Sequence, residues 1–185
     1  MSGPAGGNDA AARRINALKS VLDPRPYAHM FRILHFYAYS HTRQKVRLTL
    51  GSGVRLAPNV SIRNGERISI ADHAHIGERS YLWAGNEAGR IDIGEYALFG
   101  PEVFVTASDY QIAPDVPVMH QPKRERDVRI GRDVWLGARV VVTAGVEIGD
   151  GCIVGAGSVV TRSLPPGSIA VGAPARVVGK RSEHG

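Results

Sequence analysis

The sequence predicts an all-β protein built as a solenoid of short parallel strands. From residue 130 to residue 160, a branched apolar residue recurs at every sixth position. These anchors are Ile130, Leu136, Val142, Ile148, Val154 and Val160. The residue after an anchor is often Gly, and the residue four positions after it is usually small or β-branched. A helix repeats at about 3.6 residues and a strand at about 2, whereas six-residue repeats are typical of β-helices.

The same spacing extends back toward the N-terminus in groups of three anchors. The earlier groups are Leu50, Leu56 and Ile62; Ile70, Ile76 and Leu82; and Ile93, Phe99 and Val105. Three hexapeptides make one triangular coil, so the groups predict five coils, at 50–67, 70–87, 93–110, 130–147 and 148–165. Stacked coils cover one another's anchors and bury them in continuous ladders. We expect the glycines of the repeat to provide positive φ at the corners.

The segment before the repeat is predicted to be helical. A capping residue, Asn8 or Asp9, begins a helix that runs to about Leu22, and the prolines of 23–26 interrupt it. Apolar and aromatic residues then mix with His and Arg over 27–44. This second stretch has two interpretations: a helix that caps the open end of the solenoid, or an interfacial helix in peripheral contact with a membrane.

One long interruption separates the third coil from the fourth. Val105 and Ile130 are 25 positions apart, where six would continue the pattern. The intervening residues, 107–128, contain three prolines and many charges, which predicts a loop ejected from the scaffold. Such loops often carry function. The chain thus divides into an N-terminal helical cap at 1–47, the repeat domain at 48–166 with loop 107–128, and a closing segment at 167–185.

The composition limits the cellular location of the protein and the kinds of molecule that it could bind. The single cysteine, Cys152, occupies a small inward position of the repeat, which predicts a buried thiol and a reducing, cytoplasmic location. We recognise no signal peptide and no apolar run long enough to span a bilayer. The net charge of +6 comes with no recognisable nucleic-acid-binding module. Basic clusters at 123–132 and 176–181 flank the repeat and favour a phosphorylated cofactor instead.

The motifs of the repeat resemble those of the bacterial hexapeptide-repeat acyltransferases. The resemblance covers about 50–180 and is carried by Ile130-Gly-Arg-Asp-Val-Trp-Leu-Gly137, Gly145-Val-Glu-Ile-Gly-Asp-Gly151, Gly155-Ala-Gly-Ser-Val-Val-Thr-Arg162 and Gly172-Ala-Pro-Ala-Arg176. The most similar branch contains the maltose and galactoside acetyltransferases and relatives that modify surface polysaccharides. The resemblance implies a left-handed parallel β-helix, a homotrimer with active sites between subunits, and acetyl-CoA as acyl donor. It also implies work in polysaccharide biosynthesis, in the cytoplasm or at the inner membrane surface.

The same resemblance assigns cofactor-binding roles to seven residues. It places Trp135 as a wall of the reaction centre, and Ala138 and Ala156 along the groove for the pantetheine arm. Thr161 and Arg162 match a pair near the nucleotide end. Arg176 matches a basic position that would pair with a phosphate, and Lys180 is a weaker addition.

The catalytic base is where the sequence departs from the family. Members carry a His at the start of the ejected loop, and here Tyr110 occupies that position, next to Asp109. Three hypotheses follow. His120, later in the loop, serves as the base; Tyr110 orients the acceptor or relays a proton with Asp109; or the usual base is lost. A tyrosine of ordinary pKa, about 10, is a weak base at neutral pH.

We therefore predict a CoA-dependent O-acyltransferase that acetylates a hydroxyl of a sugar or surface glycan. The alternatives are a trimeric CoA-binding scaffold without catalysis and an N-acyltransferase that acts on an amino sugar. No metal is expected, because the Ile-Gly-His pattern of the γ-class carbonic anhydrases, which share the coil, is absent. We expect His73 and His75 to face solvent.

Overall fold

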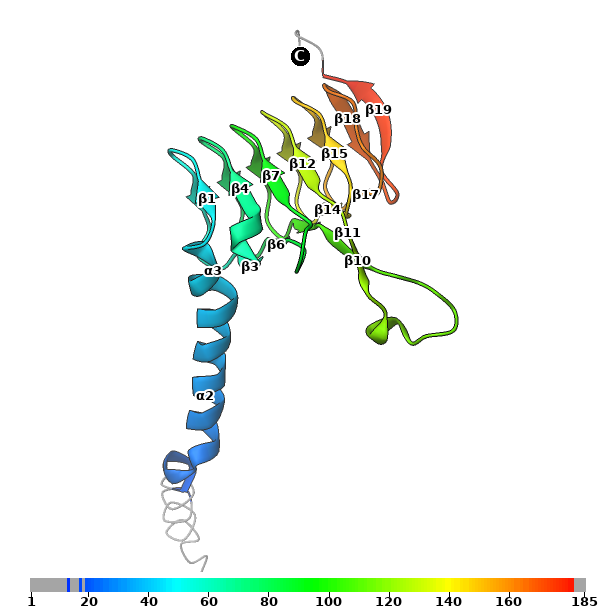
Figure 1. Cartoon of the computed structure of the whole chain (residues 1–185). Helices are drawn as coiled ribbons and strands as arrows, with labels where there is room; N and C mark the ends of the chain where they lie inside the picture. Colours follow the sequence, from blue (N-terminus) through cyan, green and yellow to red (C-terminus); the bar gives the residue numbers. More distant parts are fainter. Residues whose placement is uncertain (1–12, 14–16, 18, 182–185) are drawn as a thin grey trace, which may run out of the picture. The chain divides into compact units, whose positions relative to one another are not determined.

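A computed structural model describes residues 13, 17 and 19–181. The chain forms two compact units, Met1–Ala38 and Tyr39–Gly185. The second unit is a left-handed parallel β-helix of five coils, which confirms the predicted fold class (Figure 1). The helix start predicted at Asn8 or Asp9 lies outside the described residues.

Each coil contributes one strand to each of three sheets whose coil strands run parallel. The first sheet contains β1 (Thr49–Leu50), β4 (Ile68–Ile70), β7 (Ile91–Ile93), β12 (Val128–Ile130) and β15 (Glu147–Ile148). The second contains β2 (Arg55–Leu56), β5 (His75–Ile76), β8 (Leu98–Phe99), β13 (Trp135–Leu136), β16 (Ile153–Val154), β18 (Ser168–Val171) and β19 (Arg176–Lys180). The third contains β3 (Ser61–Arg63), β6 (Tyr81–Trp83), β9 (Phe104–Thr106), β14 (Val141–Val142) and β17 (Val159–Val160).

The predicted anchors pair with one another from coil to coil. In the first sheet the pairs are Leu50 with Ile70, Ile70 with Ile93, Ile93 with Ile130, and Ile130 with Ile148. All but the first of these side chains are buried. Leu50 is 45% exposed because it belongs to the first coil. Each buried aliphatic side chain contributes about 1.5–3 kcal/mol, so the three ladders supply most of the stability of the solenoid.

The predicted role of the corner glycines is confirmed for the glycines that lie three residues before an anchor, such as Gly145 and Gly151, which have positive φ, and is wrong for the glycine that follows an anchor. Positive φ occurs three residues before an anchor, for example at Asp133 and Arg139, and not at the glycine after it. That glycine instead allows the coils to approach closely. A Cβ added to Gly137 would lie 2.6 Å from the backbone nitrogen of Ala156 in the next coil. The repeat therefore needs glycine there for space and not for backbone conformation.

Helix α2 (Pro24–Tyr37) belongs to the first unit. The Asp23 carboxylate caps it by accepting a hydrogen bond from the backbone N–H of Arg25 at 2.9 Å, with proline in the first turn. The prolines predicted to interrupt the helix thus begin a new one. Within the described residues, no helix combines the length and the apolar content needed to cross a bilayer.

A π-helical turn, η1 (Ala38–Thr42), and the short α3 (Arg43–Lys45) precede the first coil. The Lys45 ammonium donates to the carbonyl oxygens of Ala57 and Pro58, at 3.2 and 2.8 Å. Burial lowers the pKa of Lys45. These bonds tie the chain before the solenoid to the corner of its first coil.

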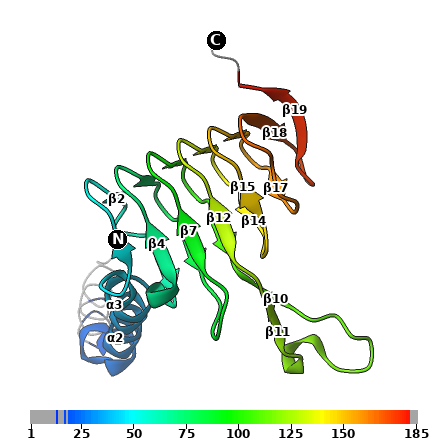
Figure 2. The same ribbon diagram turned by 45° about the horizontal axis from the view of Figure 1, so that its top comes forward.

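The interruption between the third and fourth coils is more ordered than a simple loop. Strands β10 (Ser108–Tyr110) and β11 (Lys123–Glu125) pair antiparallel and form the stem of a projecting hairpin (Figure 2). A 3₁₀ turn, η3 (Val118–His120), lies near its tip. The buried Gln121 side chain accepts a hydrogen bond from the N–H of Ala113 and donates to the carbonyls of Ala113 and Val116. These bonds hold the tip of the hairpin together.

The C-terminal segment closes the solenoid with a second hairpin. Strand β18 adds to β16 in parallel, and β19 returns antiparallel to β18. Cys152 is buried beneath this segment, as predicted, and its thiol donates to the carbonyl of Pro165 at 3.0 Å.

Candidate functional site

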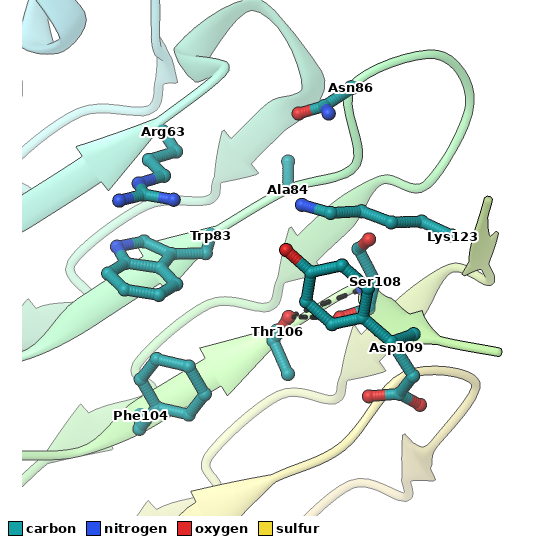
Figure 3. A pocket seen from close by; sticks show the side chains of 10 residues that line it. Arg63, Trp83, Ala84, Asn86, Phe104, Thr106, Ser108, Asp109 and Lys123 are labelled. Atoms are coloured by element: carbon teal, nitrogen blue, oxygen red, sulfur yellow. Dashed lines mark hydrogen bonds between the residues drawn. The ribbon is translucent and has the colours of Figure 1, made fainter. Parts of the chain in front are cut away.

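A cavity lies where the hairpin leaves the third sheet. Its volume is about 330 Å³, and its walls come from the outer face of β3, β6 and β9, the turn after β6, and the hairpin stem (Figure 3). The residues that line it are Arg63, Trp83, Ala84, Asn86, Phe104, Thr106, Ser108, Asp109, Tyr110 and Lys123. It is therefore built from three consecutive coils and from the longest segment that interrupts the repeat.

An aromatic wall stands on the solenoid side of the cavity. The rings of Trp83 and Phe104 meet edge to face, with centroids 5.1 Å apart. The guanidinium carbon of Arg63 lies 4.0 Å from the centroid of the Trp83 ring, which is cation–π contact. Arg63, Trp83 and Thr106 are cross-strand partners in successive coils, so the pleat aligns their side chains on one face.

The chain enters the hairpin through a side-chain-stabilised turn. The Thr106 hydroxyl donates to the carbonyl of Ser108 at 3.0 Å and accepts from its backbone N–H at 3.2 Å. Threonine commonly competes with sheet pairing in this way. The Ser108 hydroxyl is buried and has no hydrogen-bond partner within the described part of the chain. The turn sets the direction in which Asp109 and Tyr110 leave the solenoid.

The structure brings together two of the three predicted catalytic residues. Asp109 and Tyr110 both line the cavity. The nearest cation to Asp109 is Arg126, with 3.8 Å between Nη2 and Oδ2. The Lys123 ammonium lies 5.2 Å from the centroid of the Tyr110 ring. His120 is exposed in η3 and is not among the residues that line the cavity.

Glu125 fixes the wall of the cavity opposite the aromatic residues. Its carboxylate accepts four backbone N–H bonds, from Asn86, Glu87, Ala88 and Gly89, at 2.5 to 3.0 Å. Burial raises the pKa of this carboxyl, but the four N–H donors outweigh that effect and hold the pKa at about 2. The hairpin stem and the turn at 85–89 are thereby fastened to each other.

The predicted cofactor residues lie elsewhere on the solenoid. Trp135 faces outward, half-exposed, from β13 of the second sheet. Ala138 and Ala156 stack at the corner that follows this sheet, where the Gly157 N–H donates to the Ala138 carbonyl at 2.8 Å.

The remaining predicted cofactor residues are in the last coil and its closing hairpin. Thr161 and Arg162 directly follow β17, and Arg176 and Lys180 are on β19; all four are exposed. None of the seven lines the cavity. Thr161 nevertheless occupies the position after its anchor, as Arg63, Trp83 and Thr106 do in earlier coils. The cavity and the predicted nucleotide end therefore belong to one edge of the third sheet.

Sequence reasoning missed Arg63, Trp83, Phe104 and Lys123 as site residues. A signal existed for two of them, because Arg63 and Trp83 occupy the position after an anchor, where other hexapeptides often have glycine. A bulky side chain at that position projects from the coil. Lys123 gave no such signal, since its place depends on how the hairpin pairs.

The two histidines of the second coil differ from each other. His73 is exposed, as predicted, and stacks on Tyr96 with ring centroids 5.1 Å apart. His75 occupies an outward position, as predicted, and pairs with Leu98. Its side chain is only partly exposed, and its Nδ1 is buried without a hydrogen-bond partner in the described structure. Among residues 13, 17 and 19–181, no group of three His, Cys, Asp or Glu could hold a metal ion.

Comparison with known sequences adds to this geometry. The family described as bacterial transferase hexapeptide (six repeats) matches residues 127–162. Nodulation protein L from Rhizobium meliloti (strain 1021) is 38% identical over 132 residues, which are 70% of this chain and 69% of that protein.

Solved structures with the same fold include two acetyltransferases. A maltose O-acetyltransferase from Clostridium difficile 630 superposes with a TM-score of 0.65 at 29% identity, over 73% of this chain and 70% of that one. A hexapeptide-repeat acetyltransferase from Vibrio cholerae O1 biovar eltor, complexed with acetyl-CoA, gives a TM-score of 0.68 at 27% identity, over 76% and 75%.

Proposed function

The chain belongs to the bacterial hexapeptide-repeat acyltransferases, and we propose that it transfers an acetyl group from acetyl-CoA to a hydroxyl of a sugar or glycan. One observation carries the proposal beyond family membership. The longest interruption of the repeat places a carboxylate, Asp109, and a phenol, Tyr110, in a cavity walled by aromatic rings. Aromatic faces and a few polar groups are the usual surface for a sugar ring.

The chemistry is direct acyl transfer. The acceptor hydroxyl oxygen attacks the thioester carbonyl, and its proton passes to the Asp109 carboxylate. The tetrahedral intermediate then expels the CoA sulfur, which leaves as the thiol after taking up that proton. Tyr110 orients the acceptor, and the unpartnered Ser108 hydroxyl is our candidate donor to the oxyanion. His120 has no role in this scheme, because it does not line the cavity.

We assign the donor to the later coils. Ala138 and Ala156 place small side chains at one corner of the solenoid, which suits an extended pantetheine arm. Thr161, Arg162, Arg176 and Lys180 would hold the nucleotide end, where exposed cations can pair with phosphates.

A homotrimer accounts for the different outer faces of the three sheets. The outward column of the first sheet is polar: Thr49, Ser69, Asp92, Arg129 and Glu147. The corresponding column of the second sheet includes Leu98, Trp135, Ile153 and Ile169, and that of the third includes Tyr81, Phe104, Val141 and Val159. Packing the second sheet of one copy on the third sheet of the next closes a ring and buries both apolar columns. It also brings Trp135 of one copy toward the cavity of its neighbour.

The segment 27–44 is the part that we assign to peripheral membrane contact. Large apolar side chains of α2, including Phe31, Leu34 and Phe36, are exposed, and His and Arg are interspersed among them. Aromatic and basic residues together suit the interface between headgroups and acyl chains.

Thiol release from acetyl-CoA tests the activity. The purified protein is incubated with acetyl-CoA and neutral, acidic and amino sugars, and free CoA is read with a thiol reagent. The only cysteine in the sequence is Cys152, and burial raises the pKa of its thiol, so it adds little background. We expect release that depends on a sugar acceptor, with an ester product that hydroxylamine cleaves.

No histidine is among the described residues that line the cavity, and two alternatives to the proposed function follow. A hydroxylamine-resistant product formed only with amino sugars would identify an N-acyltransferase. CoA binding without turnover on any acceptor would identify a non-catalytic scaffold.

A further inference from the structure

We propose that the natural acceptor carries an acidic group, a carboxylate or a phosphate, and that Arg63 and Lys123 hold it. The inference rests on the proposed function and specifies the substrate of the same cavity. Both cations line the cavity, and they come from different parts of the fold. Arg63 belongs to β3 of the first coil, whereas Lys123 belongs to β11 of the hairpin.

The two side chains converge from opposite walls. The Arg63 guanidinium is fixed by its contact with the face of Trp83, with 4.0 Å from its carbon to the ring centroid. The Lys123 ammonium lies 5.2 Å from the centroid of the Tyr110 ring. Its side chain extends toward the side of the cavity formed by Arg63 and Trp83 (Figure 3). An anion between them would meet a planar guanidinium fork on one side and an ammonium on the other.

The surrounding charges leave these two cations uncompensated. Neither Arg63 nor Lys123 forms an ion pair with any residue that the structure describes. Asp109, the one carboxylate that lines the cavity, has its own cation in Arg126. The nearby Glu125 is occupied by four backbone N–H groups. Arg63 and Lys123 therefore carry two positive charges in the cavity, and the one negative charge there, on Asp109, is already paired with Arg126. A neutral sugar would leave the cavity with excess positive charge.

The acyl donor is a poorer source for this anion. The residues assigned to its nucleotide end lie at the fifth coil, and Arg63 lies at the first. Four coil steps of about 4.8 Å separate them, or roughly 19 Å. The thioester must point toward Asp109, which is in β10 directly after the third coil, so the phosphates of CoA remain at the far end. The first coil is therefore on the acceptor side of the reacting carbonyl.

Matched acceptors test the inference directly. Glucuronate has a carboxylate where glucose has a hydroxymethyl group. Glucose 6-phosphate tests a phosphate at the same position. We expect kcat/KM to favour an acidic sugar over glucose by about tenfold or more. Arg63→Gln and Lys123→Gln should each reduce that preference at least about fivefold. Arg124→Gln removes a charge from the adjacent residue of β11, which does not line the cavity, and should keep the preference.

A binding measurement separates this inference from the proposed function. The sequence has two tryptophans, so Trp135→Phe leaves Trp83, beside Arg63, as the only indole reporter. Titration with glucuronate or glucose 6-phosphate should change its fluorescence at concentrations at least about tenfold below those needed for glucose. Selective binding without transfer would overturn the proposed function alone. Equal response to charged and neutral sugars, or a preference unchanged in both Gln variants, would overturn the inference. A rise in KM for acetyl-CoA in those variants, with unchanged acceptor preference, would assign the cations to the donor instead.

Discussion

The Asp109 carboxylate is the residue on which the proposed mechanism depends. Asp109→Asn keeps the size of the side chain and removes its ability to take a proton. We expect kcat to fall by about 10²-fold or more, with a small change in KM for acetyl-CoA. Tyr110→Phe, which removes only a positioning hydroxyl, should cost about tenfold or less. Steady-state thiol release measures both.

His120→Ala is the control for this comparison, because the histidine is in the same hairpin but outside the cavity. Its kcat should stay within about twofold of the unaltered protein. A loss in His120→Ala as large as that in Asp109→Asn would show that the hairpin moves His120 to the acceptor and that the base is misassigned.

Glu125 predicts a pH-dependent loss of stability. Its pKa of about 2 is below the ordinary value of 4.5, so the carboxylate binds its proton less readily in the folded protein. Its contribution is present above about pH 4.5 and is lost as the pH falls toward 2. Glu125→Gln should lower the free energy of unfolding at pH 7 by about 2 kcal/mol. This value includes a reduction for solvent screening, because the side chain is partly exposed. The substitution should also flatten the stability profile between pH 4.5 and 2.

Chemical denaturation across that pH range measures the effect of Glu125. Glu87→Gln is the matched control, since Glu87 is in the turn that Glu125 binds and its own carboxylate is exposed. An equal flattening in both variants would mean that general charge, and not the four N–H bonds, sets the profile.

Individual residues of the site could be predicted only where the family resemblance or the repeat pointed to them. Asp109 and Tyr110 were found because they lie at the start of the interruption, where the resemblance places the catalytic histidine. Trp83 and Lys123 were not, since they line the same cavity only through coil stacking and hairpin pairing. Trp83 and Lys123 are distant in sequence, and no local sequence pattern encodes the strand pairing that brings them to one cavity.

The coil is the element whose prediction was most complete. Every anchor pairs with its predicted counterpart in the next coil, because a period of six leaves one register that turns all the anchors inward. The function of the glycine after the anchor was misread, since sequence shows that a small residue is needed but not why. The hairpin stem at 108–125 was also missed. Its strands are three residues long and lack apolar alternation.

The close contact at Gly137 gives a prediction for the coil. Gly137→Ala places a methyl group 2.6 Å from the Ala156 nitrogen, and the backbone of neither coil can yield without breaking ladder hydrogen bonds. We expect a loss of about 2–3 kcal/mol in the free energy of unfolding. Thermal unfolding followed by circular dichroism measures it.

Gly179→Ala is the appropriate comparison, because a Cβ there would meet no atom within 4 Å. It should change stability by no more than about 0.5 kcal/mol. If both variants lost a similar free energy of unfolding, the loss would come from the change in strand flexibility and not from the close spacing between coils.

At the scale of the whole molecule, the cavity of one chain accounts for only part of a transferase. Asp109 lines the cavity beside the third sheet, while Trp135 faces outward from the second sheet of the same solenoid. In the ring of three copies that we propose, the apolar columns of neighbouring subunits join these faces. The family resemblance predicted this assembly, and no feature of the hexapeptide period itself requires it, since a single stack of coils buries its anchors without a partner.

Ile153→Glu tests the assembly. The substitution puts a charge in the apolar column of the second sheet, beside Trp135. Burying an unpaired carboxylate at an interface costs several kcal/mol, so we expect sedimentation equilibrium to report monomers in place of trimers. Acetyl transfer should fall with assembly, because each site would lose the wall supplied by its neighbour. Glu147→Lys also changes charge, but it lies in the polar column of the first sheet and should leave the trimer intact. A monomeric Ile153→Glu protein with undiminished kcat would show that one chain holds the complete site, and a trimer that survives this substitution would exclude the second sheet from the interface.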